Sequence, residues 1–162
     1  MSDPVYNPNF DKMDNEIIRL LTKRGRMPIG EMAKKLKITA PTVRNRIKDL
    51  EKKGIVKLAG LIDPSKHQAL LTALVAISVR SHGKLDQILD KLGRLPNVAW
   101  AGVVTGRYDI IADVIFVGGK DELYQFTNET ILKMGNIVRS ETFIVMKSKH
   151  NWLCLPDGVG NI

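Results

Sequence analysis

Residues 39–54, TAPTVRNRIKDLEKKG, carry side chains that could bind nucleic acid. At about 100° per residue, Val43, Ile47 and Leu50 form an apolar stripe, and the opposite face is polar and basic. Arginine, asparagine and lysine suit base edges and phosphates in a major groove. The alternative is a solvated basic helix in an ordinary bundle. We predict DNA contacts from the start and the flanks of this helix, at Thr39, Pro41, Thr42, Arg44, Asn45, Arg46 and Lys48.

A second candidate site lies in residues 103–114, VVTGRYDIIADV, where Thr-Gly-Arg separates two apolar runs. One interpretation is a tight β-hairpin in which Gly106 supplies a positive φ and Asp109 is a polar residue at the start of a strand. The other is a loop whose glycines let a ligand approach the backbone, with Asp109 binding an α-amino group. Both can hold at once, because Gly106 can make the turn and also shape a pocket.

The remaining reactive side chains do not form a catalytic or metal-binding pattern. The sequence lacks paired carboxylates, a phosphate-binding loop and a Ser/His/Asp set, and its three histidines, His67, His82 and His150, are scattered. The single cysteine, Cys154, cannot form an internal disulfide. We expect no metal, no cofactor other than a small effector, and no enzymatic activity.

The pattern of residues 11–54 predicts a helix-turn-helix, which would position the basic helix. Two earlier apolar periodicities, in residues 11–25 and 27–38, precede the 39–54 helix and are separated from it by a short turn. Residues 1–66 carry 15 Lys/Arg against 8 Asp/Glu, and this +7 accounts for most of the chain's net charge of +8. A basic end of this kind is typical of a nucleic-acid-binding unit.

The second part predicts a different fold. Residues 55–66 are expected to form an extended connector strand that Asp63-Pro64 ends. Apolar strands and two helices then follow in the order β-α-β-β-α-β, with Asp121 as the expected cap of the second helix. This order indicates a ferredoxin-like antiparallel sheet with both helices on one face. The fold class is therefore α+β, a winged-helix-like helix-turn-helix domain followed by a ferredoxin-like domain.

Two strands of the predicted sheet are apolar on both faces. Leu70 to Val79 and Ile110 to Val117 lack the alternation expected of a sheet with one face in water. Two helices cover only one face, so a second subunit is the expected cover of the other. A homodimer would also suit DNA, because a two-fold protein meets two half-sites about one helical turn apart.

This combination resembles the Lrp/AsnC (feast/famine) transcriptional regulators. The resemblance is carried by FDKMDNEIIRLL, by the 31–56 helix-turn-helix and by the Thr-Gly-x-Tyr-Asp pattern, and it extends from about Asn9 to Lys149. It implies dimers that can assemble into octamers, and small effectors, most often amino acids, bound near the strand-turn-strand. The effector residues it implies here are Gly102, Thr105, Gly106, Arg107, Tyr108 and Asp109.

Two departures from the family pattern concern the ligand. Gln68 stands where the family often has glycine, and Arg107 stands where an acidic or small residue is common. A cation in the loop could favour an acidic or doubly charged effector. Two other functions stay open at this point. One is a decarboxylase of sirohaem-type tetrapyrroles with the same two-domain plan, and the other is a ligand-sensing module with no DNA role.

The sequence thus predicts four segments: a DNA-binding domain at 1–54, the connector at 55–66, an effector-binding and oligomerisation domain at 67–149, and a tail at 150–162. No run approaches the ~20 apolar residues of a membrane span, and the start does not resemble a secretory signal. We expect a cytoplasmic protein whose partners are double-stranded DNA, its own copies and a small effector.

Overall fold

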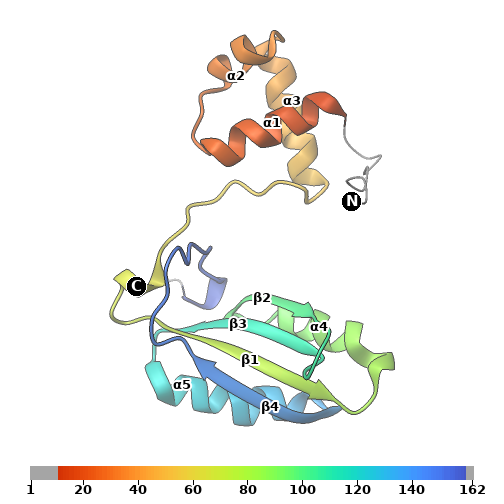
Figure 1. Cartoon of the computed structure of the whole chain (residues 1–162), viewed down its shortest axis with the longest axis vertical. Helices are drawn as coiled ribbons and strands as arrows, with labels where there is room; N and C mark the ends of the chain where they lie inside the picture. Colours follow the sequence, from red (N-terminus) through yellow and green to blue (C-terminus); the bar gives the residue numbers. More distant parts are fainter. Residues whose placement is uncertain (1–10, 160–162) are drawn as a thin grey trace. The chain divides into compact units, whose positions relative to one another are not determined.

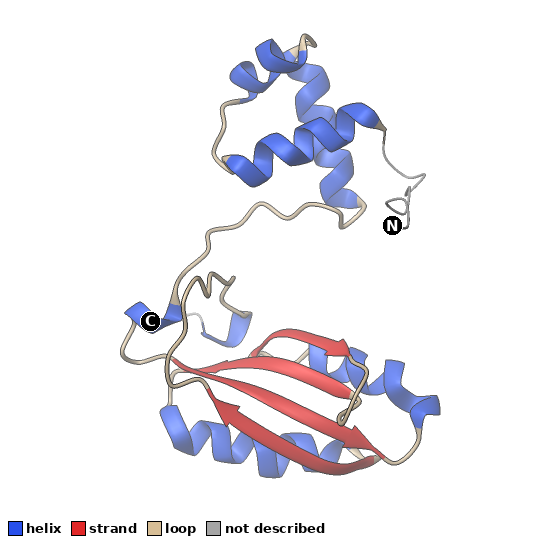
Figure 2. Cartoon of the chain, viewed as in Figure 1, coloured by secondary structure: helices blue, strands red, loops and turns tan. Residues whose placement is uncertain are grey.

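The computed structural model describes residues 11–159, which divide between Ala59 and Gly60 into two compact units. Figure 1 and Figure 2 show a helical first unit and a second unit built on one sheet. The division falls inside the predicted connector. Residues 1–10 and 160–162, the outer ends of the first and last predicted segments, lie outside the described range.

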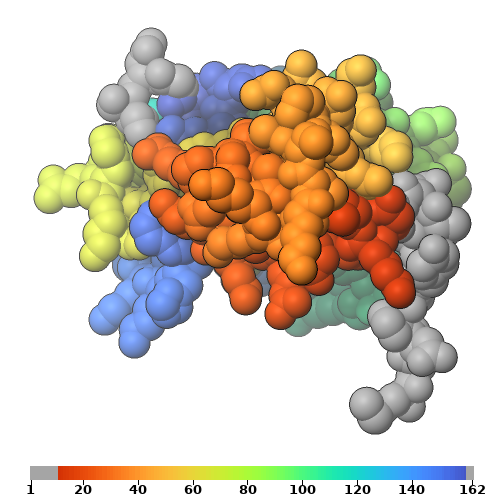
Figure 3. All heavy atoms as spheres, turned by 90° about the horizontal axis from the view of Figure 1, so that it is seen from above, coloured from red at the N-terminus to blue at the C-terminus, as the bar shows by residue number. Residues whose placement is uncertain are grey.

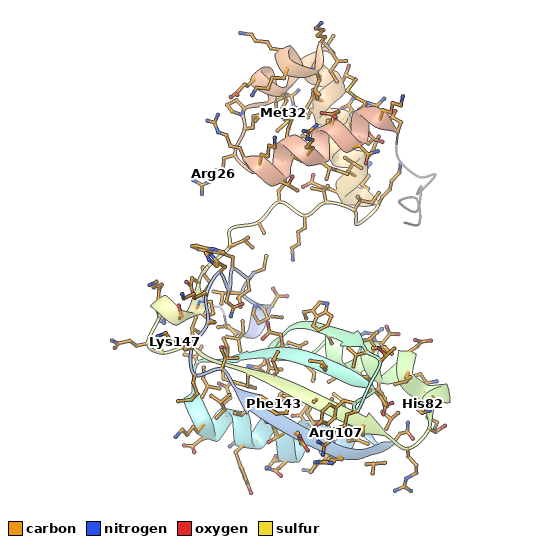
Figure 4. All side chains as sticks on the ribbon, viewed as in Figure 1. Arg26, Met32, His82, Arg107, Phe143 and Lys147 are labelled. Atoms are coloured by element: carbon orange, nitrogen blue, oxygen red, sulfur yellow. The ribbon has the colours of Figure 1, made fainter. Side chains whose placement is uncertain are left out.

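The first unit is a bundle of three helices, α1 (Lys12–Lys23), α2 (Ile29–Leu36) and α3 (Ala40–Lys52). Each helix presents one apolar stripe to a shared core. The fully buried members of that core are Ile17, Met32, Val43 and Leu50, and Figure 4 shows Met32 among the helices. The three helices predicted from periodicity are confirmed, and each is one or two residues shorter at either end than its predicted stretch.

The helix ends of the first unit are capped by side-chain and backbone hydrogen bonds. The Thr39 hydroxyl accepts a hydrogen bond from the Thr42 N–H at 3.3 Å, so Thr39 is the N-cap of α3. Gly54 follows the C-cap with φ +68°, a left-handed conformation that favours glycine. Lys37 ends α2 with φ 55°. Lys37 and Thr39 lie in the short turn that separates α2 from α3, as a helix-turn-helix requires.

The second unit contains a four-stranded antiparallel sheet in the order β2-β3-β1-β4. Its strands are β1 (Leu71–Val79), β2 (Val98–Val103), β3 (Ile110–Phe116) and β4 (Ile137–Ile144). The helix α4 (Leu85–Gly93) follows β1, and α5 (Gly119–Gln125) follows β3. Both helices lie on the same face of the sheet (Figure 1), as the ferredoxin-like prediction requires.

The second helix departs from the prediction in detail. It begins two residues before Asp121, which lies in its first turn and does not cap it. The carboxylate of Glu122 instead accepts the N–H of Gly118 at 2.9 Å, so the cap comes from a residue inside the helix. After Gln125 the helix widens into a π-helical segment, Phe126–Ile131, and ends in a 3₁₀ turn, Leu132–Met134.

The connector prediction was wrong in one respect, since residues 55–66 do not form a strand. A strand needs a partner along its length, and within the described chain only Ile62 has one, through mutual backbone hydrogen bonds with Leu153 of 2.9 and 3.0 Å. A 3₁₀ turn, Pro64–Lys66, follows. The tail folds back onto its own unit, where the Gly158 N–H donates to the carbonyl of Pro96 at 2.9 Å.

Candidate functional site

The predicted DNA-contacting residues lie at the start and on the outer face of α3. Arg44, Asn45 and Lys48 are exposed, and the described part of the chain offers no hydrogen-bond or ion-pair partner to their side chains. Figure 3 shows α2 and the start of α3, in orange, on the face of this unit that is turned toward the viewer. Three polar or cationic side chains are thus free to bind a ligand outside the fold.

The other residues of this set also serve the helix itself. The Thr39 and Thr42 hydroxyls lie 2.7 Å apart and take part in the N-cap. Pro41 occupies the first turn, where its missing N–H costs nothing. All three are exposed, so a DNA contact from them would come in addition to their role in starting the helix.

Arg46 lies in a different environment from its neighbours. Its Nη1 donates to Asp11 Oδ2 at 2.8 Å and to Asp14 Oδ1 at 2.7 Å, which ties the middle of α3 to the start of α1. The Asp14 hydrogen bond, with that of Asp11, raises the pKa of Arg46. The pKa of Asp11 is lowered, first by the Asp14 N–H and then by Arg46. Only a third of the Arg46 side chain is exposed, so its principal contacts are internal.

The second candidate site is the loop 104–109, which joins β2 to β3 as a hairpin. The Val104 N–H donates to the Asp109 carbonyl at 2.9 Å, and Gly106 has φ +123°. A Cβ on Gly106 would meet no atom within 4 Å, so the backbone conformation alone demands glycine there. The predicted hairpin with a positive φ at Gly106 is confirmed. The exposed tip, Thr105 to Arg107, is open to a ligand.

Asp109 is committed to contacts within the protein. Its Oδ2 accepts the Val79 N–H at 2.8 Å, and its Oδ1 lies 2.9 Å from His82 Nε2. The Val79 hydrogen bond, followed by the one from His82, lowers the pKa of Asp109. The carboxylate therefore fastens the loop to the end of β1 and to the turn that carries His82 (Figure 4).

Tyr108 and Arg107 face β4. The Tyr108 hydroxyl donates to Glu141, and Arg139 forms an ion pair with the same carboxylate. The Arg107 guanidinium lies 5.7 Å from the centre of the Tyr108 ring and 3.9 Å from Glu141. Figure 4 shows Arg107 over the same side of the sheet as Phe143. We call Arg107, Tyr108, Arg139 and Glu141 the loop cluster.

Gly102 has a packing role. A Cβ at this position would lie 2.5 Å from Cζ2 of the Trp100 ring, so a side chain there would displace the indole. Gly102 lies on β2, opposite Ile111 of β3, and not in the loop. Among the predicted effector residues, the fold therefore brings Thr105 to Asp109 together and places Gly102 apart on the strand.

Sequence reasoning missed the partners of both sites. Asp11 and Asp14 lie more than thirty positions from Arg46, and His82 and Glu141 are similarly distant from the loop. The capping pattern around Asp11 was the one available signal, since Asp14 completes a capping box there. The predicted ferredoxin-like sheet implies that β1 pairs with β4, but the sequence does not give the register that brings Glu141 to Tyr108.

Each of the two units matches a model of a known protein family. Residues 10–57 match a model for winged helix-turn-helix DNA binding, and residues 72–152 match the Lrp/AsnC ligand binding domain. An HTH-type transcriptional regulator of Pyrococcus horikoshii is 34% identical over 141 residues, which cover 86% of this chain and 88% of the relative. The chain belongs to the Lrp/AsnC family. As a member of it, the protein is a DNA-binding transcriptional regulator.

Two further relatives of this Lrp/AsnC protein come from other organisms. The regulatory protein AsnC of Haemophilus influenzae is 29% identical over 141 residues, with 86% of this chain and 93% of that protein covered. The fold matches that of a Neisseria meningitidis transcriptional regulator in complex with L-Met, at a TM-score of 0.67 and 24% identity, over 88% of this chain and 94% of the other.

Residues 11–159 of the Lrp/AsnC protein contain neither a metal-binding cluster nor a helix that could cross a membrane. No group of three or more His, Cys, Asp or Glu side chains lies close enough together to hold a metal ion. No helix in that range is both long and apolar enough to cross a bilayer.

Proposed function

We propose that this Lrp/AsnC protein binds paired DNA half-sites as a homodimer and that a small effector, an amino acid, changes its DNA affinity or assembly. The observation that carries the proposal is the exposed trio Arg44, Asn45 and Lys48 on a capped helix. Asn45 offers both a donor and an acceptor to a base edge, and the two cations suit phosphates or guanine. Thr39, Pro41, Thr42 and Arg46 are secondary contacts that also build the helix.

The open face of the sheet supports the homodimer. Cross-strand pairing places Trp100, Asp113, Leu74 and Phe143 in one row across β2, β3, β1 and β4, on the face away from α4 and α5. Trp100 is 55% exposed, Phe143 49% and Leu74 39%, an unusual density of apolar surface for a face in water. A second sheet packed on this row would bury it, and further contacts between dimers would give assemblies up to octamers.

The effector site of this proposal is the 104–109 loop. The matched ligand-binding domain spans it, and a structural relative was solved with L-Met. Gly102, Thr105, Gly106, Arg107, Tyr108 and Asp109 are its proposed residues. An effector can favour one assembly over another only if it binds that assembly more tightly. A coupling free energy of about 1–3 kcal/mol between effector binding and assembly is typical. A cytoplasmic location follows from the proposed access to DNA and amino acids.

Fluorescence anisotropy tests this function. The full-length protein is titrated into its own upstream duplex and into a scrambled duplex, at two salt concentrations, with and without the twenty amino acids. We expect tighter binding to the upstream duplex that persists at the higher salt and shifts with the amino acids. Equal, salt-sensitive binding to both duplexes, unaffected by the amino acids, would contradict the proposal.

A further inference from the structure

Both carboxylates beside the 104–109 loop are already used within the protein. Asp109 accepts the Val79 N–H at 2.8 Å and pairs with His82 at 2.9 Å. Glu141 accepts from Tyr108 and pairs with Arg139. A ligand ammonium group that bound Asp109 would have to share its carboxylate with the Val79 N–H and His82. The loop therefore offers no free carboxylate to an amino group.

The Arg107 guanidinium is held in place but keeps its donors available. The Tyr108 ring lies under it at 5.7 Å, and Glu141 is 3.9 Å from its Nη2, which is an ion-pair contact beyond hydrogen-bond distance. No hydrogen bond of its five N–H groups is found in residues 11–159, and 70% of the side chain is exposed. A planar guanidinium in this state matches a carboxylate in the bidentate geometry.

A second cation lies next to Arg107. Arg139 shares Glu141 with it, and 51% of the Arg139 side chain is exposed. Two guanidiniums thus surround one carboxylate, so the loop cluster carries a net charge of +1 and attracts an anion. A ligand that brings an ammonium group would meet like charge here, whereas a second carboxylate would meet opposite charge.

We infer that the effector is a small dicarboxylate, an acidic amino acid or a diacid, with one carboxylate bound by Arg107 and its net negative charge matched by the loop cluster. The inference rests on the proposed effector function of the loop. It narrows the effector from any amino acid to compounds with two carboxylates. Because Asp109 is paired within the protein, the amino group of the ligand is not needed for binding.

Isothermal titration calorimetry on the full-length protein tests this with three probes of similar size: glutarate, glutamate and glutamine, at an ionic strength matched with sodium chloride. Glutamine removes the second negative charge, and glutarate removes the amino group. We expect glutamate to bind at least about tenfold more tightly than glutamine, because glutamine has no net negative charge to match the loop cluster. Glutarate is expected to bind within about threefold of glutamate.

Two variants test whether Arg107 is the residue that binds glutamate. Arg107→Gln keeps a polar side chain and removes the charge, and it is expected to weaken glutamate binding at least about tenfold. Arg94→Gln is the matched control, because Arg94 is an exposed arginine that ends α4 and precedes the end of β2 that is remote from the loop. It is expected to bind glutamate within about twofold of the unchanged protein.

Each other outcome overturns the inference in a different way. If glutamine binds as tightly as glutamate, the charge argument fails. If glutamate binds and glutarate does not, the amino group is recognised and Asp109 is available after all. If none of the three binds, the dicarboxylate class fails. The anisotropy experiment with the twenty amino acids then tests the proposed function separately. If the amino acids shift DNA binding, the protein has an effector of another class. If they do not, both the dicarboxylate inference and the proposed effector response are wrong.

Discussion

At the scale of single residues, the first unit depends on Arg46. It is the partner of Asp14, whose side chain is only 12% exposed, and of the capping residue Asp11. Replacing Arg46 by alanine would leave the Asp14 carboxylate buried without a counter-ion. We expect Arg46→Ala to lower the free energy of unfolding by about 1–3 kcal/mol, measured by urea denaturation. Lys48→Ala, on the exposed face, is the control and should change stability by less than about 0.5 kcal/mol. Similar stability for both variants would contradict the internal role of Arg46.

The second residue-scale prediction concerns Asp109. Its pKa is lowered by the Val79 N–H and by His82, so its ionised form is favoured in the folded protein. The stability that this provides is present above the ordinary value of 3.8 and is lost as the pH falls through the lower folded value. We expect Asp109→Asn to lower the free energy of unfolding by about 1 kcal/mol at pH 7. The difference from the unchanged protein should vanish below the folded pKa. A difference that stays constant from pH 7 to pH 3 would contradict this account.

At the scale of elements, the start of α3 depends on the hydroxyl of Thr39. The hydroxyl accepts the Thr42 N–H, one of the free donors at the helix start. We expect Thr39→Ala to cost about 1 kcal/mol of stability, measured by thermal denaturation, and Thr39→Ser to retain most of it, because serine caps equally well. Equal losses in the two variants would show that the methyl group, and not the cap, is what matters.

The sequence was most informative about elements and least about contacts between them. Thr39, Gly54 and Gly106 form a helix cap, a helix end and a turn through chemistry local to each residue, and the turn at Gly106 was predicted. The Arg46–Asp14 and Tyr108–Glu141 pairs depend on how helices and strands pack, and no local pattern encodes that. The start of α5 was misplaced because Glu122 reaches back to Gly118. The connector was expected to be a strand because its residues are apolar, but strand formation also requires a partner.

At the scale of the whole molecule, Asp113 allows a test of whether a second subunit covers the open face of the sheet. It lies between Trp100 and Leu74 in the exposed row, and burial raises its pKa. The ionised form is therefore disfavoured, and stability is lost as the pH rises through the ordinary value of 3.8 to the folded value. A second sheet on this face would add to the burial. We expect Asp113→Asn to tighten self-association at pH 7, measured by sedimentation equilibrium. The exposed control Asp90→Asn should leave it unchanged, and equal effects would contradict burial of this face in a dimer.

In the proposed function, α3 recognises DNA through Asn45 and Lys48. The direct measurement is the anisotropy of the upstream and scrambled duplexes with Asn45→Ala and Lys48→Ala, across a series of salt concentrations. We expect Asn45→Ala to lose about 1–3 kcal/mol of preference for the upstream duplex, because a base contact is removed. Lys48→Ala should weaken binding to both duplexes alike and lower the salt slope by about 1, as expected for a phosphate contact. If both variants bind both duplexes as the unchanged protein does, α3 is not the DNA-recognition surface.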